Sequence, residues 1–169
     1  NTVYPLIVIL YAMPKSAFAP LMVIWVGYGL FSKIAIAFLV AFFPIVVNTV
    51  VGLKEVEPEL LELARINRGS EMDVFKKIRL PNSLPYMFAG IKVAIVLSVT
   101  GAIVAEFVAA NEGLGYLVLQ ANYSLDTAFA LVILLILAVL SLGLFWLAEF
   151  LQRKLAPWSA AVREVEGSF

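Results

Sequence analysis

The residue types that most often carry out chemistry in proteins are scarce in this sequence. It contains no Cys and no His, which removes thiolate nucleophiles, zinc sites built on these residues, the usual haem ligands and the commonest proton switch near neutral pH. A glycine-rich phosphate loop ending in Gly-Lys-Ser or Gly-Lys-Thr is also missing from the sequence, so any ATP chemistry would belong to another chain. We therefore expect no catalytic residue, no metal site and no enzyme activity in this chain.

Three polar side chains stand inside long apolar stretches. Lys92 and Glu106 lie near the start and the end of one stretch, and Asn48 lies within another. An ionisable or polar group inside a membrane is a functional candidate, so Asn48 and Glu106 are candidates for a translocation path. A structural role is nevertheless favoured for both: a salt bridge or an interfacial position for Glu106, and a hydrogen bond to a neighbouring helix for Asn48. Lys92 is expected to extend towards the membrane interface.

The elements that must carry these residues are long apolar helices. Apolar residues make up 63% of the sequence and charged residues only 14%, with a net charge of zero. Such scarce and clustered charge is typical of a membrane protein, and the zero net charge offers no basic surface for nucleic acid. Four stretches are long enough to cross a bilayer as helices, at about 2–30, 34–53, 86–109 and 127–150. The expected fold class is therefore all-α, a polytopic bundle of transmembrane helices.

The first of these stretches differs from the others. Its prolines, Pro5, Pro14 and Pro20, predict a helix that is kinked or broken into two pieces. The chain also opens at Asn1 without Met and without a signal peptide. We interpret it as the C-terminal part of a longer protein.

The distribution of Lys and Arg predicts how the chain crosses the membrane. Residues 54–81 carry six basic residues and three more follow the fourth stretch, whereas residues 93–152 carry none. By the positive-inside rule, the loop at 54–81 and the C-terminus are cytoplasmic, and the loop at 110–126 faces outside. Lys33 then lies on the outer side as well.

The external loop at 110–126 contains a short apolar segment. Gly113 and Gly115 allow a tight turn before it, and the apolar run 114–119 is too short to span a bilayer. We expect a short helix at the outer interface. It either caps the bundle or contacts the transported solute.

The loop at 54–81 has the local signals of two short helices. Pro58 suits the first turn of one helix, and Gly69 is expected to end it. Ser70 has Asp73 three residues later, which is the spacing of a capping box at the start of a second helix.

Both helices of this loop are amphipathic. Pro81 is expected to end the second helix. The first helix carries an apolar face formed by Leu60, Leu61, Ala64 and Ile66. An exposed apolar face on such short helices needs a partner to cover it. The pattern alone does not decide between packing on the chain's own membrane helices and binding another protein.

This loop resembles the EAA loop of permeases in ATP-binding-cassette importers. The pattern of that loop is Glu-Ala-Ala, three residues, Gly, nine residues, Ile, one residue and Leu-Pro. The matching residues stand at the family spacing: Glu62, Leu63 and Ala64 for the opening, and Ile78, Leu80 and Pro81 for the ending. There is one departure, because Arg68 stands where the family has glycine and Gly69 comes one place later.

The resemblance covers most of the chain. Segments similar to the nitrate, sulfonate and taurine branch of these importers occur in the same order at 13–21, 25–27, 43–49, 84–86, 105–106 and 113–116. Each segment is a weak signal alone, whereas their order and spacing together are specific. Members of this branch are longer, so one or two further helices are expected upstream of this sequence.

The resemblance implies how such a chain works. It would be the permease subunit of a type I importer, a multi-pass protein of the bacterial inner membrane with no cofactor of its own. ATP and Mg²⁺ would bind to a separate cytoplasmic ATP-binding subunit, and an extracytoplasmic solute-binding protein would deliver the solute. A second permease copy, most simply a homodimer, would complete the path through the lipid membrane.

The resemblance also assigns a role to the loop. It would be the coupling element that docks on the ATP-binding subunit, through Glu59, Leu60, Leu61, Glu62, Leu63, Ala64, Arg65, Ile66, Arg68 and Gly69.

The main alternative is a secondary transporter or channel that is not driven by ATP. Such proteins usually carry paired intramembrane charges, and a structured cytoplasmic loop would be unnecessary for them. The residues do not indicate the substrate, because a binding protein selects it in this family. Sulfonates, taurine, nitrate, thiamine-type pyrimidines and riboflavin-like compounds all fit the resemblance.

Overall fold

Helices form all of the regular structure in the computed structural model, which describes residues 15–158. In chain order they are η1 (Lys15–Phe18), α2 (Ala19–Val26), α3 (Leu30–Lys54), α4 (Pro58–Ile66), α5 (Glu71–Val74), η2 (Phe75–Arg79), α6 (Leu80–Ala109), α7 (Leu114–Tyr123) and α8 (Thr127–Leu155). The short element η1 is a 3₁₀ helix, and η2 is a π-helical turn. The all-α fold class expected from the sequence is confirmed.

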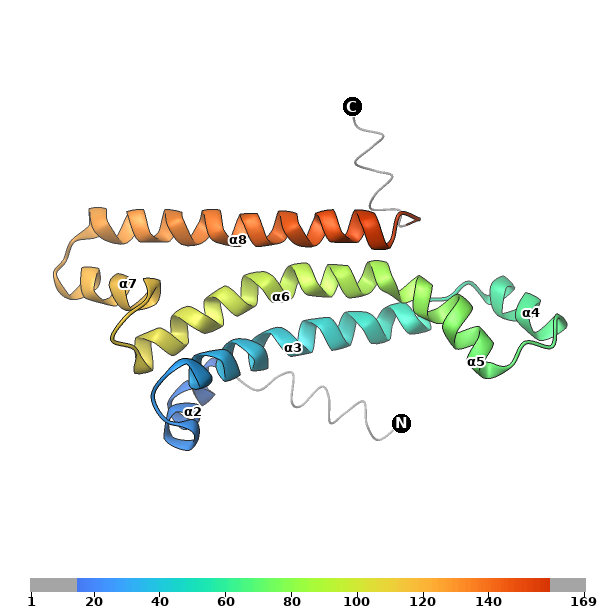
Figure 1. Ribbon diagram of the computed structural model, residues 1–169, viewed down its shortest axis with the longest axis horizontal. Helices are drawn as coiled ribbons and strands as arrows, with labels where there is room; N and C mark the ends of the chain where they lie inside the picture. The colour runs from blue at the N-terminus through green and yellow to red at the C-terminus, as the bar shows by residue number, and fades with distance from the viewer. Residues whose placement is uncertain (1–14, 159–169) are drawn as a thin grey trace, which may run out of the picture. The chain divides into compact units, whose positions relative to one another are not determined.

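Three helical segments among the described residues are long and apolar enough to cross a membrane (Figure 1). They are α3, the continuous stretch Glu71–Val108, and α8. The predicted stretches at 34–53 and 127–150 fall inside α3 and α8. The loop at 110–126 contains the helix α7, as its apolar run predicted.

The long helices each contribute to two compact units. Within the described residues, the first unit contains 15–43 and 94–143, and the second contains 44–93 and 144–158. Each unit therefore holds a segment of α3, of α6 and of α8. The first unit also holds α2 and α7, and the second also holds α4, α5 and η2.

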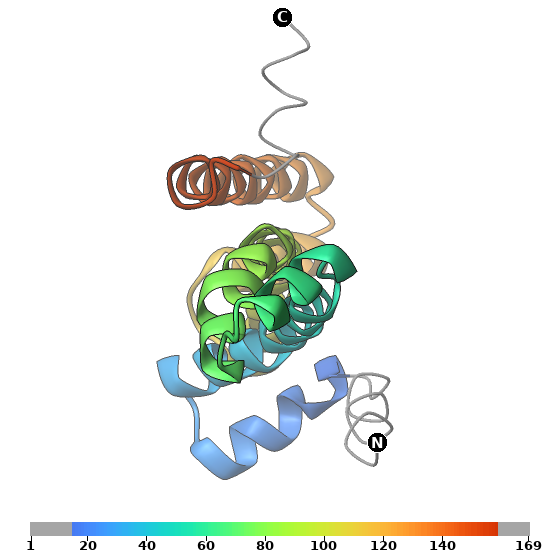
Figure 2. The ribbon, with the colours of Figure 1, turned by 90° about the vertical axis from the view of Figure 1, so that its right-hand side faces the viewer.

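In the first unit, α2, α3 and α6 pack around a small apolar core. Ala19, Ile36 and Ala105 are almost fully buried there, and α2 folds back beside the first turns of α3 (Figure 2). A Cβ on Gly101 would lie only 3.3 Å from the Cα atom of Ala37. Close approach through small residues is a common way for helices to associate in membranes.

In the second unit, α3 and α6 pack closely at Gly90. A Cβ at this position would lie 2.8 Å from the carbonyl oxygen of Pro44, so a larger residue would push the two backbones apart. Asn48 lies at the same contact, and its Nδ2 donates to the Pro44 carbonyl of its own helix at 2.8 Å. The predicted hydrogen bond from Asn48 to a neighbouring helix is therefore replaced by a bond within α3, where the carbonyl four residues earlier is within reach.

Many apolar side chains on these helices are uncovered. In α8, Leu135 and Val139 expose 66% and 71% of their surface. Contiguous apolar surface of this kind is rare on proteins in water. It is the surface expected of helices that are covered by lipid or by further transmembrane helices.

The first predicted span ends earlier than expected. Its residues 2–14 lie outside the described residues. Pro20 sits in the first turn of α2, where its missing N–H has no helical acceptor to lose. After α2, Gly27 and Gly29 have φ values of 87° and 138°, which glycine adopts far more readily than other residues. The break therefore falls at these glycines, and Leu30 opens α3.

Pro81 does not end a helix, contrary to the expectation from the sequence. The chain is helical without interruption from Glu71 to Val108. The third long helix, α6, accordingly begins at Leu80 and not near Tyr86. The boundary was misplaced because proline is a strong but not absolute signal for the end of a helix.

Two features accommodate the prolines at the start of α6. The turn η2 immediately before Pro81 is π-helical, and such wider turns absorb a local disturbance of the helical hydrogen-bond pattern. Pro85 lacks the N–H that would bond to the Pro81 carbonyl. The indole N–H of Trp158 donates to that carbonyl instead, at 3.3 Å.

Candidate functional site

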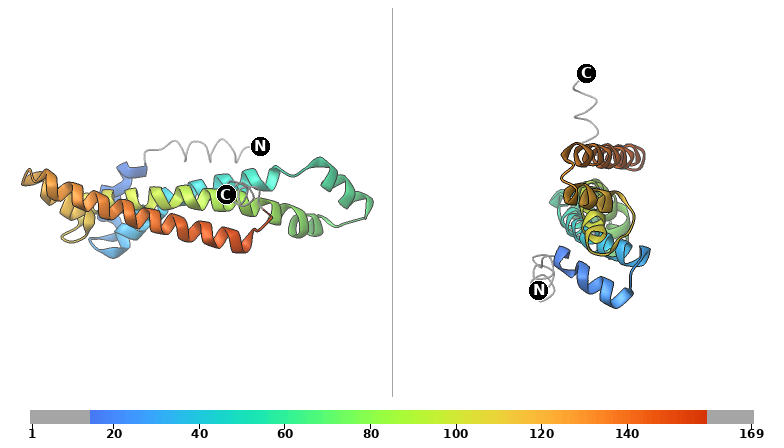
Figure 3. Two further views of the ribbon diagram at one scale, coloured as in Figure 1. Left: turned by 90° about the horizontal axis from the view of Figure 1, so that it is seen from above. Right: turned by 90° about the vertical axis from the view of Figure 1, so that its left-hand side faces the viewer.

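The predicted loop at 54–81 is a helical hairpin, with α4 as one arm and α5 with η2 as the other (Figure 3). Pro58 occupies the first turn of α4, as predicted. No residue of α4 or α5 is buried, and Leu63 and Ile66 expose 56% and 79% of their surface. The hairpin therefore presents an apolar surface that the rest of the described chain leaves uncovered.

The residues predicted to dock on a partner differ in how far their side chains are exposed. Leu61 and Ala64 are half-buried, whereas the remainder are exposed: Glu59, Leu60, Glu62, Leu63, Arg65, Ile66, Arg68 and Gly69. Acidic and apolar side chains thus alternate on the accessible surface of α4. Their role in docking stays a prediction.

The turn between the two arms is a Schellman motif. The N–H of Gly69 donates to the carbonyl of Ala64 at 2.9 Å, and the N–H of Arg68 donates to the carbonyl of Arg65 at 3.0 Å. These two bonds satisfy carbonyl groups that the end of a helix leaves without partners. Arg68 has a φ of 52°, and this left-handed conformation costs a residue with a Cβ about 1–2 kcal/mol relative to glycine.

In this turn the glycine, Gly69, comes one residue after the position whose backbone conformation favours glycine. Arg68, and not Gly69, takes the left-handed conformation that ends α4, so the expectation that Gly69 would provide this stop is wrong. Gly69 serves a close approach instead, because a Cβ there would lie 3.1 Å from the Ala64 carbonyl oxygen. The left-handed conformation therefore occurs at Arg68, the position where the resembling family has glycine.

The second arm begins with the predicted capping box. The N–H of Asp73 donates to Ser70 Oγ at 3.1 Å, and the N–H of Ser70 donates to Asp73 Oδ2 at 3.4 Å. The ammonium of Lys77 lies 2.8 Å from Asp73 Oδ1. The hydrogen bond from Lys77, followed by the one from Ser70, lowers the pKa of Asp73 from 3.8 to about 2. The carboxylate that caps this arm therefore stays ionised throughout the physiological range.

A groove of about 610 Å³ lies between the two arms. Its walls are formed by Leu61, Arg65 and Gly69 from the first arm and its turn, and by Glu71, Val74, Phe75 and Arg79 from the second arm. The groove therefore combines apolar side chains with two guanidinium groups and one carboxylate. A protein partner with apolar and charged side chains would fit such a lining.

The residues of the predicted loop ending lie at the base of the hairpin. Ile78 is half-buried in η2, Leu80 is 43% exposed, and Pro81 lies in the first turn of α6. They form the point at which the second arm continues into α6.

Asn82 is a residue of this region that the sequence analysis missed. Its Nδ2 donates to the carbonyl of Gly52 at 3.0 Å and to the carbonyl of Glu55 at 2.7 Å. It therefore ties the end of α3 to the start of α6, directly under the hairpin. The available signal was an amide with two donors immediately after the Leu-Pro ending, but its acceptors become visible only in the packed structure.

At the start of α7, Glu106 forms an ion pair with Lys33. Glu106 Oε1 lies 3.5 Å from Lys33 Nζ, and the two side chains are only 17% and 19% exposed. Glu106 Oε2 also accepts the N–H of Gly115 at 2.6 Å, and Lys33 Nζ donates to the carbonyl of Glu112 at 3.2 Å. The salt-bridge interpretation of Glu106 is confirmed, whereas a role in a translocation path stays a prediction.

Glu106 also serves as the N-terminal cap of α7. The residue in the capping position, Gly113, has no side chain to offer and has a φ of 120°. The carboxylate of Glu106 caps the helix instead. It accepts the N–H of Gly115 and places negative charge at the positive end of the helix. A Cβ on Gly113 or Gly115 would collide with this carboxylate, so the two glycines make room for it.

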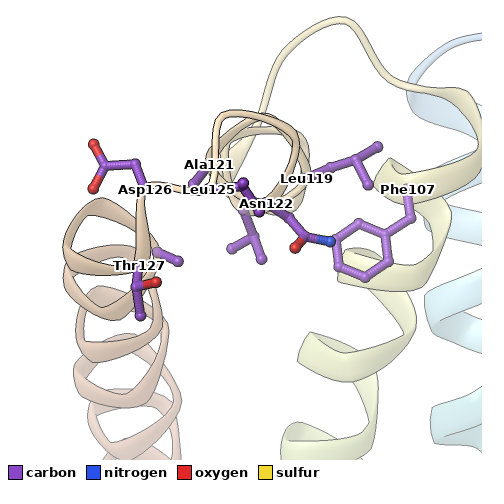
Figure 4. A pocket seen from close by; sticks show the side chains of 9 residues that line it. Phe107, Leu119, Ala121, Asn122, Leu125, Asp126 and Thr127 are labelled. Atoms are coloured by element: carbon purple, nitrogen blue, oxygen red, sulfur yellow. The ribbon is translucent and has the colours of Figure 1, made fainter.

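A smaller hollow of about 290 Å³ lies between the end of α6, α7 and the start of α8 (Figure 4). Phe107 and Asn122 point toward one another at its wall. The turn after α7 is again a Schellman motif: the N–H of Leu125 donates to the Asn122 carbonyl, and the N–H of Asp126 to the Ala121 carbonyl. Leu125 is left-handed with a φ of 55° and is 85% exposed.

Lys92, the third polar residue of the apolar stretches, lies against an aromatic ring. Its Nζ is 5.4 Å from the centroid of the Phe145 ring, within the range of a cation–π interaction. The expected position of Lys92 at the membrane interface stays a prediction.

Within the part of the chain that the structure describes, no group of three acidic side chains is placed to hold a metal ion. What stands out is an exposed hairpin at one end of α3 and α6 and an ion-paired helix cap in the first unit.

Comparison with known proteins supplies the family. The family model described as "Binding-protein-dependent transport system inner membrane component" matches residues 1–157. The riboflavin transport system permease protein RibX of Chloroflexus aurantiacus is 40% identical over 150 residues, covering 89% of this chain and 56% of that protein. The formylaminopyrimidine transport permease protein ThiX of Halalkalibacterium halodurans is 36% identical, covering 94% of this chain and 63% of that protein. The taurine transport system permease protein TauC of Escherichia coli is 31% identical, covering 94% and 58%.

The chain therefore spans less than two thirds of the length of these curated relatives. The match nevertheless includes every described transmembrane segment and the hairpin between α3 and α6. With long apolar helices, an exposed hairpin and a family match over nearly its whole length, the chain belongs to the inner membrane components of binding-protein-dependent transport systems.

Proposed function

We propose that this chain forms part of the permease of an ATP-driven importer, which carries a small polar solute across the bacterial inner membrane. The observation that supports this proposal most directly is the α4–α5 hairpin. Its apolar side chains are uncovered within the described chain, and short amphipathic helices gain most of their stability from a partner. The hairpin occupies the place of the EAA loop in the resembling importers.

In this proposal the hairpin and the C-terminus face the cytoplasm. The basic residues of 54–81 and of the segment after α8 favour this orientation. The Lys33–Glu106 ion pair and α7 then lie at the outer side of the membrane.

The hairpin would dock on a cytoplasmic ATP-binding subunit, which binds ATP and Mg²⁺. Its two arms are held by the Schellman turn and the capping box, so it would act as a short lever. Asn82 links the base of this lever to α3 and α6 together. A displacement of the hairpin would therefore move both helices and change access to the path between them and their partners.

The remaining components of the importer are also part of the proposal. A solute-binding protein would deliver the solute, and a second permease copy would complete the translocation path. The named relatives transport riboflavin, formylaminopyrimidine and taurine according to their descriptions, so the solute class spans neutral and charged small molecules. Purification of the binding protein encoded beside this chain, with identification of its bound ligand, would name the solute.

The docking function is tested by placing a charge on the apolar surface of α4 in the full-length protein. Leu63→Asp and Ala64→Asp are each expected to lower ATP-dependent solute uptake in proteoliposomes at least about tenfold, because a buried unpaired charge opposes docking. Leu63 is the cleaner position, since Ala64 borders the turn. Leu125→Asp places the same charge on an exposed leucine outside the hairpin. It is the matched control for docking and should leave the binding of the permease to the ATP-binding subunit unchanged.

Membrane insertion and the amount of folded protein are measured in parallel for all three variants. Undiminished uptake by Leu63→Asp at normal expression would contradict the proposed function.

A further inference from the structure

We propose that Arg68 recognises a carboxylate on the ATP-binding subunit, and that this contact sets the affinity of the hairpin for its partner. The inference rests on the function proposed above and adds the chemistry of the contact. It starts from the fact that an arginine occupies the left-handed position of a Schellman turn, where glycine would be free of strain.

Beyond the two backbone hydrogen bonds of the turn, no side-chain contact within the described residues stabilises this conformation. The side chains that most often tolerate it, Asn and Asp, do so by bonding to their own backbone. The Arg68 side chain, by contrast, is exposed and makes no hydrogen bond or ion pair with any residue from 15 to 158. A strained residue that persists without a local partner points to a contact outside its own chain.

The surroundings of Arg68 identify the chemistry of that contact. Arg65 lines the groove at its turn end and Arg79 lines it at the base of the hairpin, and the lining contains a single carboxylate, that of Glu71. Neither arginine is ion-paired within the described residues. The groove and the adjoining turn together therefore carry more guanidinium groups than carboxylates, and a guanidinium binds a carboxylate through two parallel hydrogen bonds.

The apolar lining of the same groove favours a protein over a lipid headgroup as the source of the carboxylate. Leu61, Val74 and Phe75 form the apolar part of its wall, and Ile66 is exposed beside the turn. A folded partner offers apolar side chains next to an acidic one, which matches this mixture. The occupant that fits is an aspartate or glutamate at the rim of an apolar contact surface on the ATP-binding subunit.

The test distinguishes the effect of the backbone conformation of Arg68 from the effect of its charge. Arg68→Gly removes the conformational strain together with the guanidinium, and Arg68→Glu reverses the charge. Each variant is made in the full-length permease and reconstituted in nanodiscs of phosphatidylcholine, with and without phosphatidylglycerol. Its Kd for the ATP-binding subunit is then measured at low and at high salt. Leu125→Gly is the matched control, because it relieves the same conformation in the same motif at a position outside the hairpin.

Arg68→Gly is expected to keep or raise the thermal stability of the permease while weakening its binding to the ATP-binding subunit about tenfold at low salt. Arg68→Glu should weaken binding further, and both variants should show a smaller loss of affinity on adding salt than the unmodified protein does. Leu125→Gly should raise thermal stability without changing the Kd.

An unchanged Kd for Arg68→Gly would overturn the inference while leaving the proposed docking function intact, provided that Leu63→Asp still abolishes binding. Loss of affinity that occurs only in nanodiscs containing phosphatidylglycerol would assign Arg68 to a lipid headgroup and would also overturn it. Failure of the unmodified permease to bind any ATP-binding subunit would remove the proposed function and the inference together.

Discussion

The carboxylate of Glu106 lies 3.5 Å from the ammonium of Lys33, near opposite ends of two different helices, and the same carboxylate accepts the N–H of Gly115 at 2.6 Å. One side chain thus joins α3, α6 and α7 in the first unit. Two partly buried opposite charges neutralise one another, and the helix end supplies a further donor.

Breaking this pair is expected to destabilise the protein. Glu106→Gln leaves the Lys33 ammonium without its counterion in a site that is mostly shielded from water, which should lower the free energy of unfolding by about 1–3 kcal/mol. Glu149→Gln breaks the more exposed pair with Arg153 and should cost less than about 1 kcal/mol. Unfolding in detergent by denaturant measures both. Equal losses for the two variants would contradict a special role for Glu106.

Exchanging the two charges of this pair should not restore stability. In the double variant Lys33→Glu with Glu106→Lys, the ion pair could form again, but Gly115 would lose the acceptor for its N–H because Lys has donors only. We expect the double variant to remain at least about 1 kcal/mol less stable than the unmodified protein. Full recovery of the melting temperature would show that capping of α7 by Glu106 is unimportant.

A methyl group at Gly115 should be poorly tolerated. Its Cβ would lie 2.9 Å from both Cβ and Oε2 of Glu106, so the carboxylate would have to move away from the helix end. The expected loss is about 1–3 kcal/mol in the free energy of unfolding. A Cβ at Gly143 in α8 would meet nothing from elsewhere in the described chain within 4 Å, and Gly143→Ala should be neutral or stabilising by up to about 1 kcal/mol. Thermal unfolding of the two variants provides the comparison.

The double hydrogen bond of Asn82 should matter for stability and for transport alike. Asn82→Leu leaves the carbonyls of Gly52 and Glu55 without this donor and should cost about 1–3 kcal/mol. If the hairpin couples the chain to an ATP-binding subunit, as proposed, uptake per ATP hydrolysed should also fall, because the bond joins α3 to α6 under the hairpin. Asn111, an exposed amide two residues after the end of α6, provides the control Asn111→Leu for stability. A variant of Asn82 with normal stability and a normal ratio of uptake to hydrolysis would contradict the linking role.

The capping box predicts a pH dependence for the second arm of the hairpin. The pKa of Asp73 is lowered from 3.8 to about 2, so the stabilisation from its ionised form is fully present above about pH 4. It is lost as the pH falls from about 4 through about 2. The titration of the Asp73 carboxyl carbon, followed by NMR in the full-length protein, should have its midpoint near the lower value. In Ser70→Ala the midpoint should move up, because one of the hydrogen bonds that lower it is gone.

Local signals in the sequence were reliable guides to several elements. The capping box at Ser70, the proline in the first turn of α4 and the short helix in the loop at 110–126 all depend on residues within one or two turns of one another. The apolar stretches that form α3 and α8 were also predicted, because a helix that crosses the hydrocarbon core of a bilayer needs about 20 consecutive apolar residues. The match of Glu62 to Pro81 identified the hairpin as the region of interest before its shape was known.

Boundaries that depend on the whole chain could not be predicted in this way. Pro81 and Pro85 were expected to separate two helices, but η2 and the indole of Trp158, distant in sequence, accommodate them. The left-handed residue of the hairpin turn was expected at Gly69, yet the two backbone hydrogen bonds of the turn require it at Arg68.

The sequence by itself determined that this protein is a bundle of membrane-crossing helices with one structured polar hairpin, because hydropathy and capping act over short distances. Only the tertiary structure decided that Glu106 pairs with Lys33 and caps α7, and that Asn82 ties α3 to α6. Such partners lie far apart along the chain. A polar group that leaves water must find whichever donor or acceptor the packed helices bring within reach.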